Sequence, residues 1–175
     1  GEGPELAKKF GVRAYPTFVI VNPDGTIRHK LVGGGEGEKF IERVKESFDD
    51  NKALGALDAK YNSGNRDKAF LSQYAQVMVA NYDPNAKAIV DELLKISTDE
   101  EKLSEDYWFI FGNSELSPKD SEAAKFLTDN RSKFNETIGK EKVDSRLSEG
   151  LFREILMVIA GRGQKTDVKR LDAIG

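Results

Sequence analysis

The sequence predicts an α/β segment over residues 1–50, followed by an all-helical segment over residues 51–175. Two observations support this fold class. The first is a pair of strand-like runs that are joined by a tight turn and flanked by helical patterns. The second is that no segment after residue 50 alternates with period two, whereas apolar residues recur there at helical spacing. We therefore expect two domains, 1–50 and 51–175.

The run Thr17–Val21 is β-branched and aromatic throughout, without polar alternation. Such a run is typical of a strand that is covered on both faces, in the middle of a sheet. The following turn, Asn22–Gly25, has proline and glycine at positions that favour a hairpin. Its partner, Thr26–Val32, alternates apolar and polar residues, as a half-exposed strand does. A central strand needs two neighbours, and this chain offers one.

Helical patterns flank the two strands. Glu2–Phe10 carries apolar residues at helical spacing, with Pro4 near the start, where a missing backbone N–H is tolerated. After the strands, an amphipathic helix is predicted from about Glu36 to Asp49. The predicted order over the first fifty residues is therefore helix, strand, strand, helix.

From Asn51 onward, helical stripes follow one another with clear start and stop signals. The first stripe stops at Gly64, and the last two helices are expected to end at Gly139 and Gly161. Capping patterns open the later helices: Asp83-Pro84, Thr98–Glu101 and Ser117-Pro118. These patterns predict antiparallel helix pairs with short connections, without a fixed sequence period.

Composition excludes several classes of function. The net charge is −3 with both signs interspersed, so we expect no nucleic-acid partner. No apolar run approaches the roughly 18 residues that a membrane span needs, so we expect no membrane span. The chain has no cysteine, which excludes disulfides, thiolate metal sites and thiol chemistry by this chain alone. We expect no catalytic residues, no cofactor and no metal ion in it.

Other candidate sites have structural explanations. The glycine run Gly33–Gly37 lies between a strand and a helix but lacks the lysine and hydroxyl residue of a phosphate loop. His29 is the single histidine, so no histidine-based metal site or catalytic triad can form, and an exposed strand position is expected. The aromatic run Tyr107–Phe111 is expected to pack between helices; if exposed, it would form a docking patch.

The first fifty residues resemble the C-terminal half of a thioredoxin domain. The matching residues are Glu5-Leu6-Ala7, Phe10-Gly11-Val12, Tyr15-Pro16-Thr17, Gly25, Gly33, Phe40 and Val44. In that family the proline is cis, and the backbone beside it pairs with an extended substrate next to the active-site thiols. The resemblance implies a cis Tyr15–Pro16 bond, and it implies that Tyr15, Pro16 and Thr17 face a polypeptide substrate.

The sequence lacks the other half of such a domain, which supplies two central strands, a helix and a Cys-x-x-Cys motif. The resemblance therefore implies a fragment of a thiol–disulfide oxidoreductase or isomerase that is redox-inactive by itself. A thioredoxin-like remnant without redox function is the other reading of the same residues. The two-sided character of Thr17–Val21 favours the fragment, because such a strand needs a second neighbour.

The helical remainder resembles the C-terminal extensions of some thioredoxin-like proteins of the bacterial envelope. The matching residues are Tyr61, Gly64-Asn65-Arg66-Asp67, Phe70-Leu71 and Tyr74. This resemblance implies a periplasmic or cell-envelope protein. An alternative function is a non-enzymatic, helical protein-binding scaffold that is mounted on a thioredoxin-like remnant.

The free edge of Thr17–Val21 predicts self-association. The run contains no charge and no proline that would block pairing with another chain. We expect a homodimer in which two copies of this strand pair antiparallel about a two-fold axis. If no dimer forms, the first fifty residues should be poorly ordered.

Overall fold

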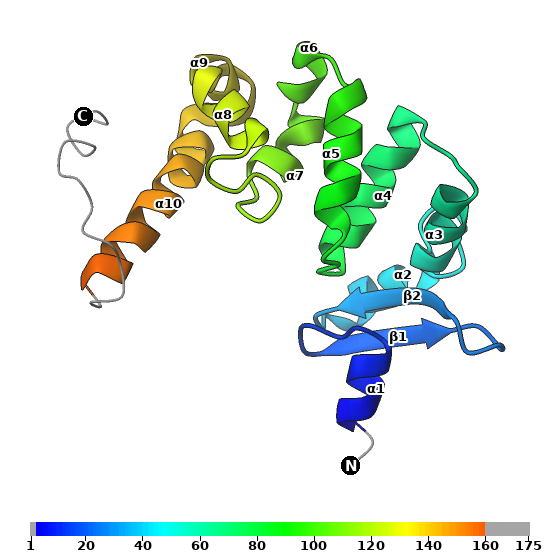
Figure 1. The fold of residues 1–175 in the computed structure, drawn as a ribbon. Coiled ribbons are helices and arrows are strands. Elements are labelled where there is room, and N and C mark those ends of the chain that lie inside the picture. The colour runs from blue at the N-terminus through cyan, green and yellow to red at the C-terminus, as the bar shows by residue number, and fades with distance from the viewer. Residues whose placement is uncertain (1–2, 160–175) are drawn as a thin grey trace. The chain divides into compact units, whose positions relative to one another are not determined.

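The computed structural model describes residues 3–159, with side chains as far as residue 149. In this part of the chain the structure is mostly helical (60%) and contains a small two-stranded antiparallel sheet (Figure 1). The predicted mixture of strands and helices is therefore confirmed. The predicted end of the last helix at Gly161 lies outside the described residues. In chain order the elements are α1 (Gly3–Lys9), β1 (Thr17–Val21), β2 (Ile27–Val32), α2 (Gly37–Glu46), α3 (Leu54–Asn62), α4 (Lys68–Ala80), α5 (Ala86–Ile96), α6 (Asp99–Lys102), η1 (Glu105–Tyr107), α7 (Trp108–Phe111), α8 (Glu122–Asp129), α9 (Arg131–Phe134), η2 (Asn135–Gly139) and α10 (Lys140–Ile159).

The chain forms two compact units, Gly1–Thr98 and Asp99–Gly175. Both strands belong to the first unit, and every described element after β2 is helical. Helices α3, α4 and α5 lie in the same compact unit as the sheet. The predicted domain division between residues 50 and 51 remains a prediction.

The predicted hairpin is confirmed. Strands β1 and β2 pair antiparallel, with Phe18 opposite Leu31 and Val19 opposite Lys30. Gly25 has φ 82°, a backbone conformation that glycine adopts without steric conflict, and its N–H donates to the Asn22 carbonyl at 2.9 Å. The turn chemistry that the sequence shows therefore produces the connection that was expected.

Strand β1 is not the central strand that its sequence predicted. Within the described residues it has β2 as its one neighbour, and none of its side chains is buried. Phe18 packs edge to face on Phe40 of α2, with 4.8 Å between ring centroids, yet remains 44% exposed. Val21 is 46% exposed. The prediction of cover on both faces is wrong for this chain, because the described residues bring no second strand to β1.

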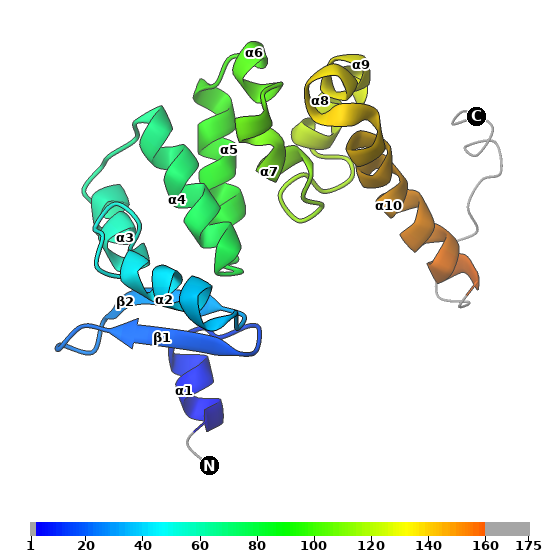
Figure 2. The same cartoon turned by 180° about the vertical axis from the view of Figure 1, so that it is seen from behind.

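The outer edge of β2 is covered by α3, which lies next to it in Figures 1 and 2. Gly55 lies so close to β2 that a Cβ there would overlap the carbonyl oxygen of Ile27 and lie 3.3 Å from that of Arg28. The N–H of Leu54 donates to Nδ1 of His29 at 3.1 Å. The first turn of the helix, whose N–H groups lack partners inside the helix, thus meets the strand directly.

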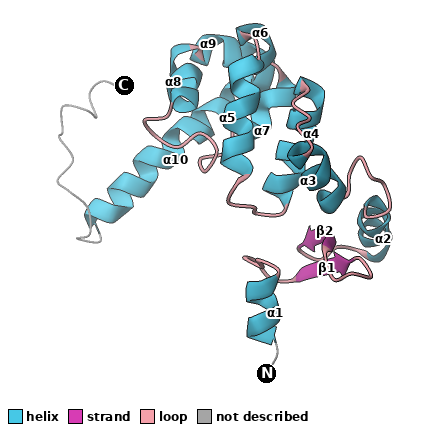
Figure 3. Ribbon diagram, turned by 45° about the vertical axis from the view of Figure 1, so that its right-hand side comes forward, coloured by secondary structure: helices cyan, strands magenta, loops and turns pink. Residues whose placement is uncertain are grey.

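Helices α3, α4 and α5 pack against one another in the first unit. Gly64, with φ 97°, follows the end of α3, so the predicted stop is confirmed. Helices α4 and α5 lie side by side in Figures 1 and 3, joined by a short connection. The core between these helices consists of apolar side chains that are at most 3% exposed: Leu57, Leu71, Ala75, Met78, Ile89, Val90 and Leu93.

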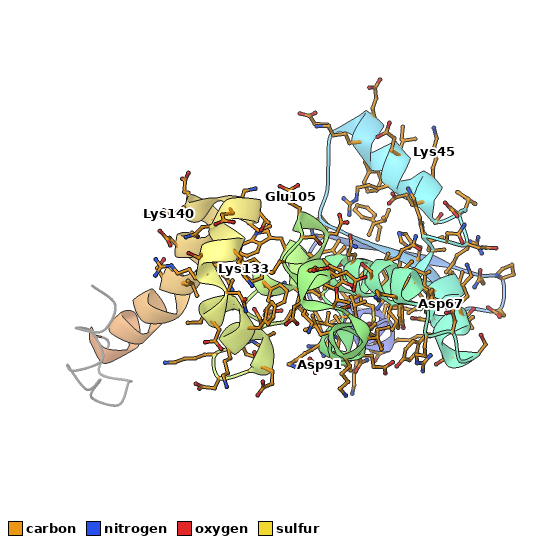
Figure 4. The ribbon with its side chains drawn as sticks, turned by 90° about the horizontal axis from the view of Figure 1, so that it is seen from above. Lys45, Asp67, Asp91, Glu105, Lys133 and Lys140 are labelled. Atoms are coloured by element: carbon orange, nitrogen blue, oxygen red, sulfur yellow. The ribbon has the colours of Figure 1, made fainter. Side chains whose placement is uncertain are left out.

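The second unit has an aromatic core. Phe111 and Phe134 are fully buried, with ring centroids 5.1 Å apart, and Phe126 packs on both rings. The predicted packing role of the aromatic run is confirmed for Tyr107 and Phe111, which are buried. Exposed charged residues cover the outside of these helices, including Glu105, Lys133 and Lys140, which are labelled in Figure 4.

The predicted helix start at Ser117-Pro118 is wrong. Ser121 is the N-cap of α8, and its hydroxyl accepts a hydrogen bond from the N–H of Ala124 at 3.1 Å. Ser117 is fully buried instead, and its carbonyl oxygen accepts from the guanidinium of Arg146 at 2.6 Å. The distant arginine, which the local pattern does not reveal, fixes Ser117 inside the fold.

The helix that was predicted to run as far as Gly139 is interrupted. Helix α8 ends at Asp129, α9 follows over four residues, and the π-helical turn η2 leads into α10. Gly139 has φ 100°, so a left-handed residue does stand at the predicted stop. The interruption at Asn130 carries no glycine or proline, which is why the sequence pattern did not show it.

Candidate functional site

The loop between α1 and β1 carries the three predicted substrate-facing residues. Helix α1 closes with the N–H of Phe10 donating to the Leu6 carbonyl at 2.9 Å and the N–H of Val12 donating to the Ala7 carbonyl at 2.8 Å. Gly11 has φ 61°, which lets the chain leave the helix at this point. Helix α1 thus ends in a loop whose start is fixed by backbone hydrogen bonds.

Tyr15, Pro16 and Thr17 follow one another into the start of β1. The Tyr15 side chain is 80% exposed, and the Tyr15–Pro16 peptide bond is cis, as expected. The hydroxyl of Thr17 donates to the Ala14 carbonyl at 2.6 Å, and the N–H of Gly33 donates to the Pro16 carbonyl at 2.8 Å. The loop is therefore held from both sides while the Tyr15 ring points into solvent.

The bond between Gly33 and Pro16 fixes which backbone groups of β1 face outward. Hydrogen-bonded and non-hydrogen-bonded pairs alternate along an antiparallel ladder. Phe18 and Ile20 therefore bond to β2, and the N–H and C=O groups of Thr17 and Val19 point away from it. No described strand pairs with these groups. The exposed loop thus continues into an open strand edge, which can accept an extended polypeptide.

A polar cluster joins α3 and α4 in the first unit. The hydroxyl of Tyr74 donates to the Asp58 carboxylate at 2.6 Å. Burial raises the pKa of Asp58, and Asp83 raises it further, while the hydrogen bond from Tyr74 and the charge of Lys30 lower it. Burial, followed by the bond to Asp58, raises the pKa of Tyr74. The cluster favours a neutral tyrosine and a carboxyl that holds its proton more readily than usual.

The residues that suggested the envelope-type extension fasten the α3–α4 connection. The Arg66 guanidinium lies over the ring of Tyr61, 3.6 Å from its centroid, and Nε pairs with Glu92 of α5 at 3.0 Å. The hydroxyl of Tyr61 donates to the same carboxylate. Tyr74 stacks on Phe70, with centroids 5.7 Å apart. Through these contacts, the residues that suggested the extension help to hold α3, α4 and α5 together.

The expectation that His29 is exposed is wrong. Its side chain is 4% exposed, and Nδ1 accepts the N–H of Leu54, so the described bond requires a neutral ring with its proton on Nε2. Burial lowers the pKa of His29 below its usual value of 6.5; Glu46 opposes this effect and Arg43 adds to it. The histidine therefore acts as a structural acceptor beneath α3.

The described residues contain no metal-binding cluster and no membrane-spanning helix. Between residues 3 and 149 no three His, Cys, Asp or Glu side chains come together in a way that could hold a metal ion. No helix in the described part of the chain is both long and apolar enough to cross a membrane. Along the sequence there is no cysteine.

No protein-family model, curated protein or solved structure matches the chain.

The sequence pattern did not reveal the structural roles of three residues. Gly55 interrupts a helical stripe, and an isolated glycine in a helix is a signal of close packing that was available in the sequence. The burial of His29 depends on α3, which lies about 25 residues further along the chain. Tyr82, 57% exposed at φ 52°, follows α4 where glycine is usual, and the sequence carries no signal for that backbone conformation.

Proposed function

We propose that this chain is part of a thioredoxin-like thiol–disulfide oxidoreductase or isomerase, and that Tyr15, Pro16 and Thr17 bind its polypeptide substrate. The observation that carries the proposal is the exposed Tyr15 side chain, held in the loop that leads into β1. The order of α1, loop, β1, β2 and α2 supports it. An extended substrate would add its backbone hydrogen bonds at the loop and place an apolar side chain on the Tyr15 ring.

The chain supplies binding groups and no redox group. Because it contains no cysteine, the Cys-x-x-Cys pair would belong to the remaining half of the domain. In that arrangement a strand of the same half pairs with the open edge of β1. The chain by itself would bind a polypeptide without reducing or oxidising it. A periplasmic or cell-envelope location belongs to the same proposal.

An insulin-reduction assay on the full-length parent protein tests the redox part. We expect reduction that depends on a cysteine pair upstream of this chain, and we expect Tyr15→Ala to raise KM more than it lowers kcat, because Tyr15 binds and does not react. A parent without a redox-active cysteine pair would refute the proposal. Inactivity of the present chain is expected in either case.

For the isolated chain, we propose a homodimer formed by two copies of β1. Antiparallel pairing centred on Val19 would make this residue a hydrogen-bonded pair with its own copy, using groups that do not serve β2. The five residues of β1 contain no charge and no proline. The covered edge of β2 leaves β1 as the strand edge that is available for association.

A helical protein-binding scaffold is the second candidate function. The observation that favours it is Phe109 of α7, which is half-buried within the second unit and makes no ring contact among the described residues. A pull-down from envelope extract with the full chain and with Phe109→Ser tests this function. The scaffold requires a discrete protein that the wild-type chain captures and Phe109→Ser does not. Equal capture by both chains would refute it.

A further inference from the structure

The connection between α4 and α5 contains an exposed tyrosine in an unfavourable backbone conformation. Tyr82 has φ 52°, and its side chain is 57% exposed. Left-handed backbone is disfavoured for residues with a Cβ, and bulky residues are uncommon there. Among the described residues, the Tyr82 side chain makes no hydrogen bond and no ring contact. No hydrogen bond or ring contact therefore accounts for a tyrosine at this position.

The hydrogen bonds around Tyr82 define a helix end at which glycine is the usual residue. The N–H of Tyr82 donates to the Val79 carbonyl at 3.0 Å, and the N–H of Asp83 donates to the Met78 carbonyl at 2.9 Å. This pair of bonds is the Schellman arrangement, whose left-handed residue is most often glycine. Glycine at position 82 would keep both bonds and remove the steric conflict.

The residue before Tyr82 also has a buried polar atom without a hydrogen-bond partner. Asn81 is 9% exposed, and its Nδ2 donates to the Val77 carbonyl at 2.8 Å. Its Oδ1 is buried and has no hydrogen-bond partner in the described structure. Buried polar atoms nearly always have a partner, so this is a second local penalty within two consecutive residues. Departures of this kind from local rules are concentrated at functional sites.

The connection lies close to the proposed substrate loop. Figures 1 and 3 place it beside the end of the sheet where β1 begins and β2 ends. On the same side, Nζ of Lys30 in β2 lies 3.7 Å from the position that a Cβ on Gly11, in the α1–β1 loop, would take. An extended polypeptide advances about 3.3 Å per residue, so it is a ligand that can contact two separate places on one unit.

We propose that Tyr82 is a specificity-determining residue that binds an aromatic or apolar side chain of the extended polypeptide held at Tyr15–Thr17. The inference rests on the proposed function and adds a second contact, contributed by the helical part of the chain. Tyrosine suits this role because it offers a rigid apolar ring with a polar tip at a small entropic penalty. The partner is an extended polypeptide with apolar side chains.

The test compares binding and stability in the same variants of the full chain. Fluorescence anisotropy measures binding of a labelled, carboxymethylated insulin B chain, which is unfolded and unable to form disulfides, and thermal unfolding measures Tm. We expect Tyr82→Gly to weaken binding at least fivefold while raising Tm by about 3 °C. The matched variant Tyr82→Phe keeps the ring and should bind within twofold of the wild-type chain.

Other results would overturn the inference. Unchanged binding by Tyr82→Gly would remove Tyr82 from the binding site, and a lower Tm would show that the tyrosine serves the fold instead. Tyr15→Ala separates this inference from the proposed function: loss of binding in Tyr15→Ala but not in Tyr82→Gly would overturn the inference alone. No binding by the wild-type chain would also overturn it, and the insulin-reduction assay on the parent would still test the redox proposal.

Discussion

The two edges of the small sheet differ in how they are covered. The outer edge of β2 meets α3, where Gly55 lies against the strand backbone and Leu54 donates to His29. No described strand pairs with the outer edge of β1, although β1 is the more apolar of the two strands. Proteins generally protect sheet edges, because an open edge pairs with other chains.

This difference shows that hydrophobic sequence and burial are separate properties. The apolar run of β1 has no buried residue, whereas β2, with alternating polar residues, buries His29 and Leu31. Burial is decided by the element that arrives from elsewhere in the chain. For β2 that element is α3. For β1 we propose either a strand from the other half of a thioredoxin-like domain or a second copy of the chain.

The largest effect is expected where α3 covers β2. Gly55→Ala would place a Cβ against the carbonyl oxygens of Ile27 and Arg28, which are backbone atoms that cannot rotate away. We expect a loss of about 3 kcal/mol in the free energy of unfolding, measured with urea. Gly37→Ala in α2 is the matched control, because a Cβ there meets no atom within 4 Å. Equal stabilities of the two variants would show that α3 does not hold the edge.

The open edge is tested by a charge at its centre. In Val19→Glu the new carboxylate lies opposite Lys30 within the monomer but opposite its own copy in the proposed dimer. We expect the dissociation constant of the dimer to rise at least a hundredfold, about 2.8 kcal/mol, in light scattering. Val32→Glu puts the same charge on the same face of the sheet, but on β2, and should leave the dimer intact. A monomeric wild-type chain with an ordered β1 would contradict the dimer.

The position of α3 on β2 also depends on the contacts between α3 and α4. Tyr74→Phe removes the hydroxyl that donates to Asp58 and leaves a half-buried carboxylate without this donor. We expect a loss of about 1.5 kcal/mol in the free energy of unfolding. Tyr61→Phe is the control and should lose less, because Glu92 keeps its ion pair with Arg66. A larger loss for Tyr61→Phe would reverse the proposed ranking of these two contacts.

The smallest effect is a dependence on pH at the covered edge. Burial lowers the pKa of His29 in the folded state, so below pH 6.5 the unfolded chain binds a proton that the folded chain does not. The contribution of neutral His29 to the free energy of unfolding is therefore fully present above pH 6.5. It decreases as the pH drops below 6.5, by at most about 1.4 kcal/mol per pH unit. Urea unfolding between pH 5 and 8 should show this slope in the wild-type chain, and His29→Gln should remove it. An unchanged slope in the variant would assign it to another group.

Local sequence signals predicted much of the fold. The Asn22–Gly25 turn produces the hairpin, Gly64 follows the end of α3, and apolar spacing marks α2, α4 and α5 within a few residues. The loop Tyr15–Thr17 was likewise located from the sequence. These features depend on backbone preferences and side-chain periodicity over a few neighbouring residues, which a single sequence contains.

The sequence by itself determined the order of elements over the first fifty residues, the turn chemistry, the absence of thiol chemistry in this chain and the open apolar edge of β1. The tertiary structure alone decided that His29 is buried, that Gly55 must remain glycine, and that Ser117 is fixed by Arg146 rather than capping a helix. The physical reason is that each of these outcomes depends on contacts between atoms about 25 or more residues apart. Such contacts follow from how elements pack, and local pattern carries no record of them.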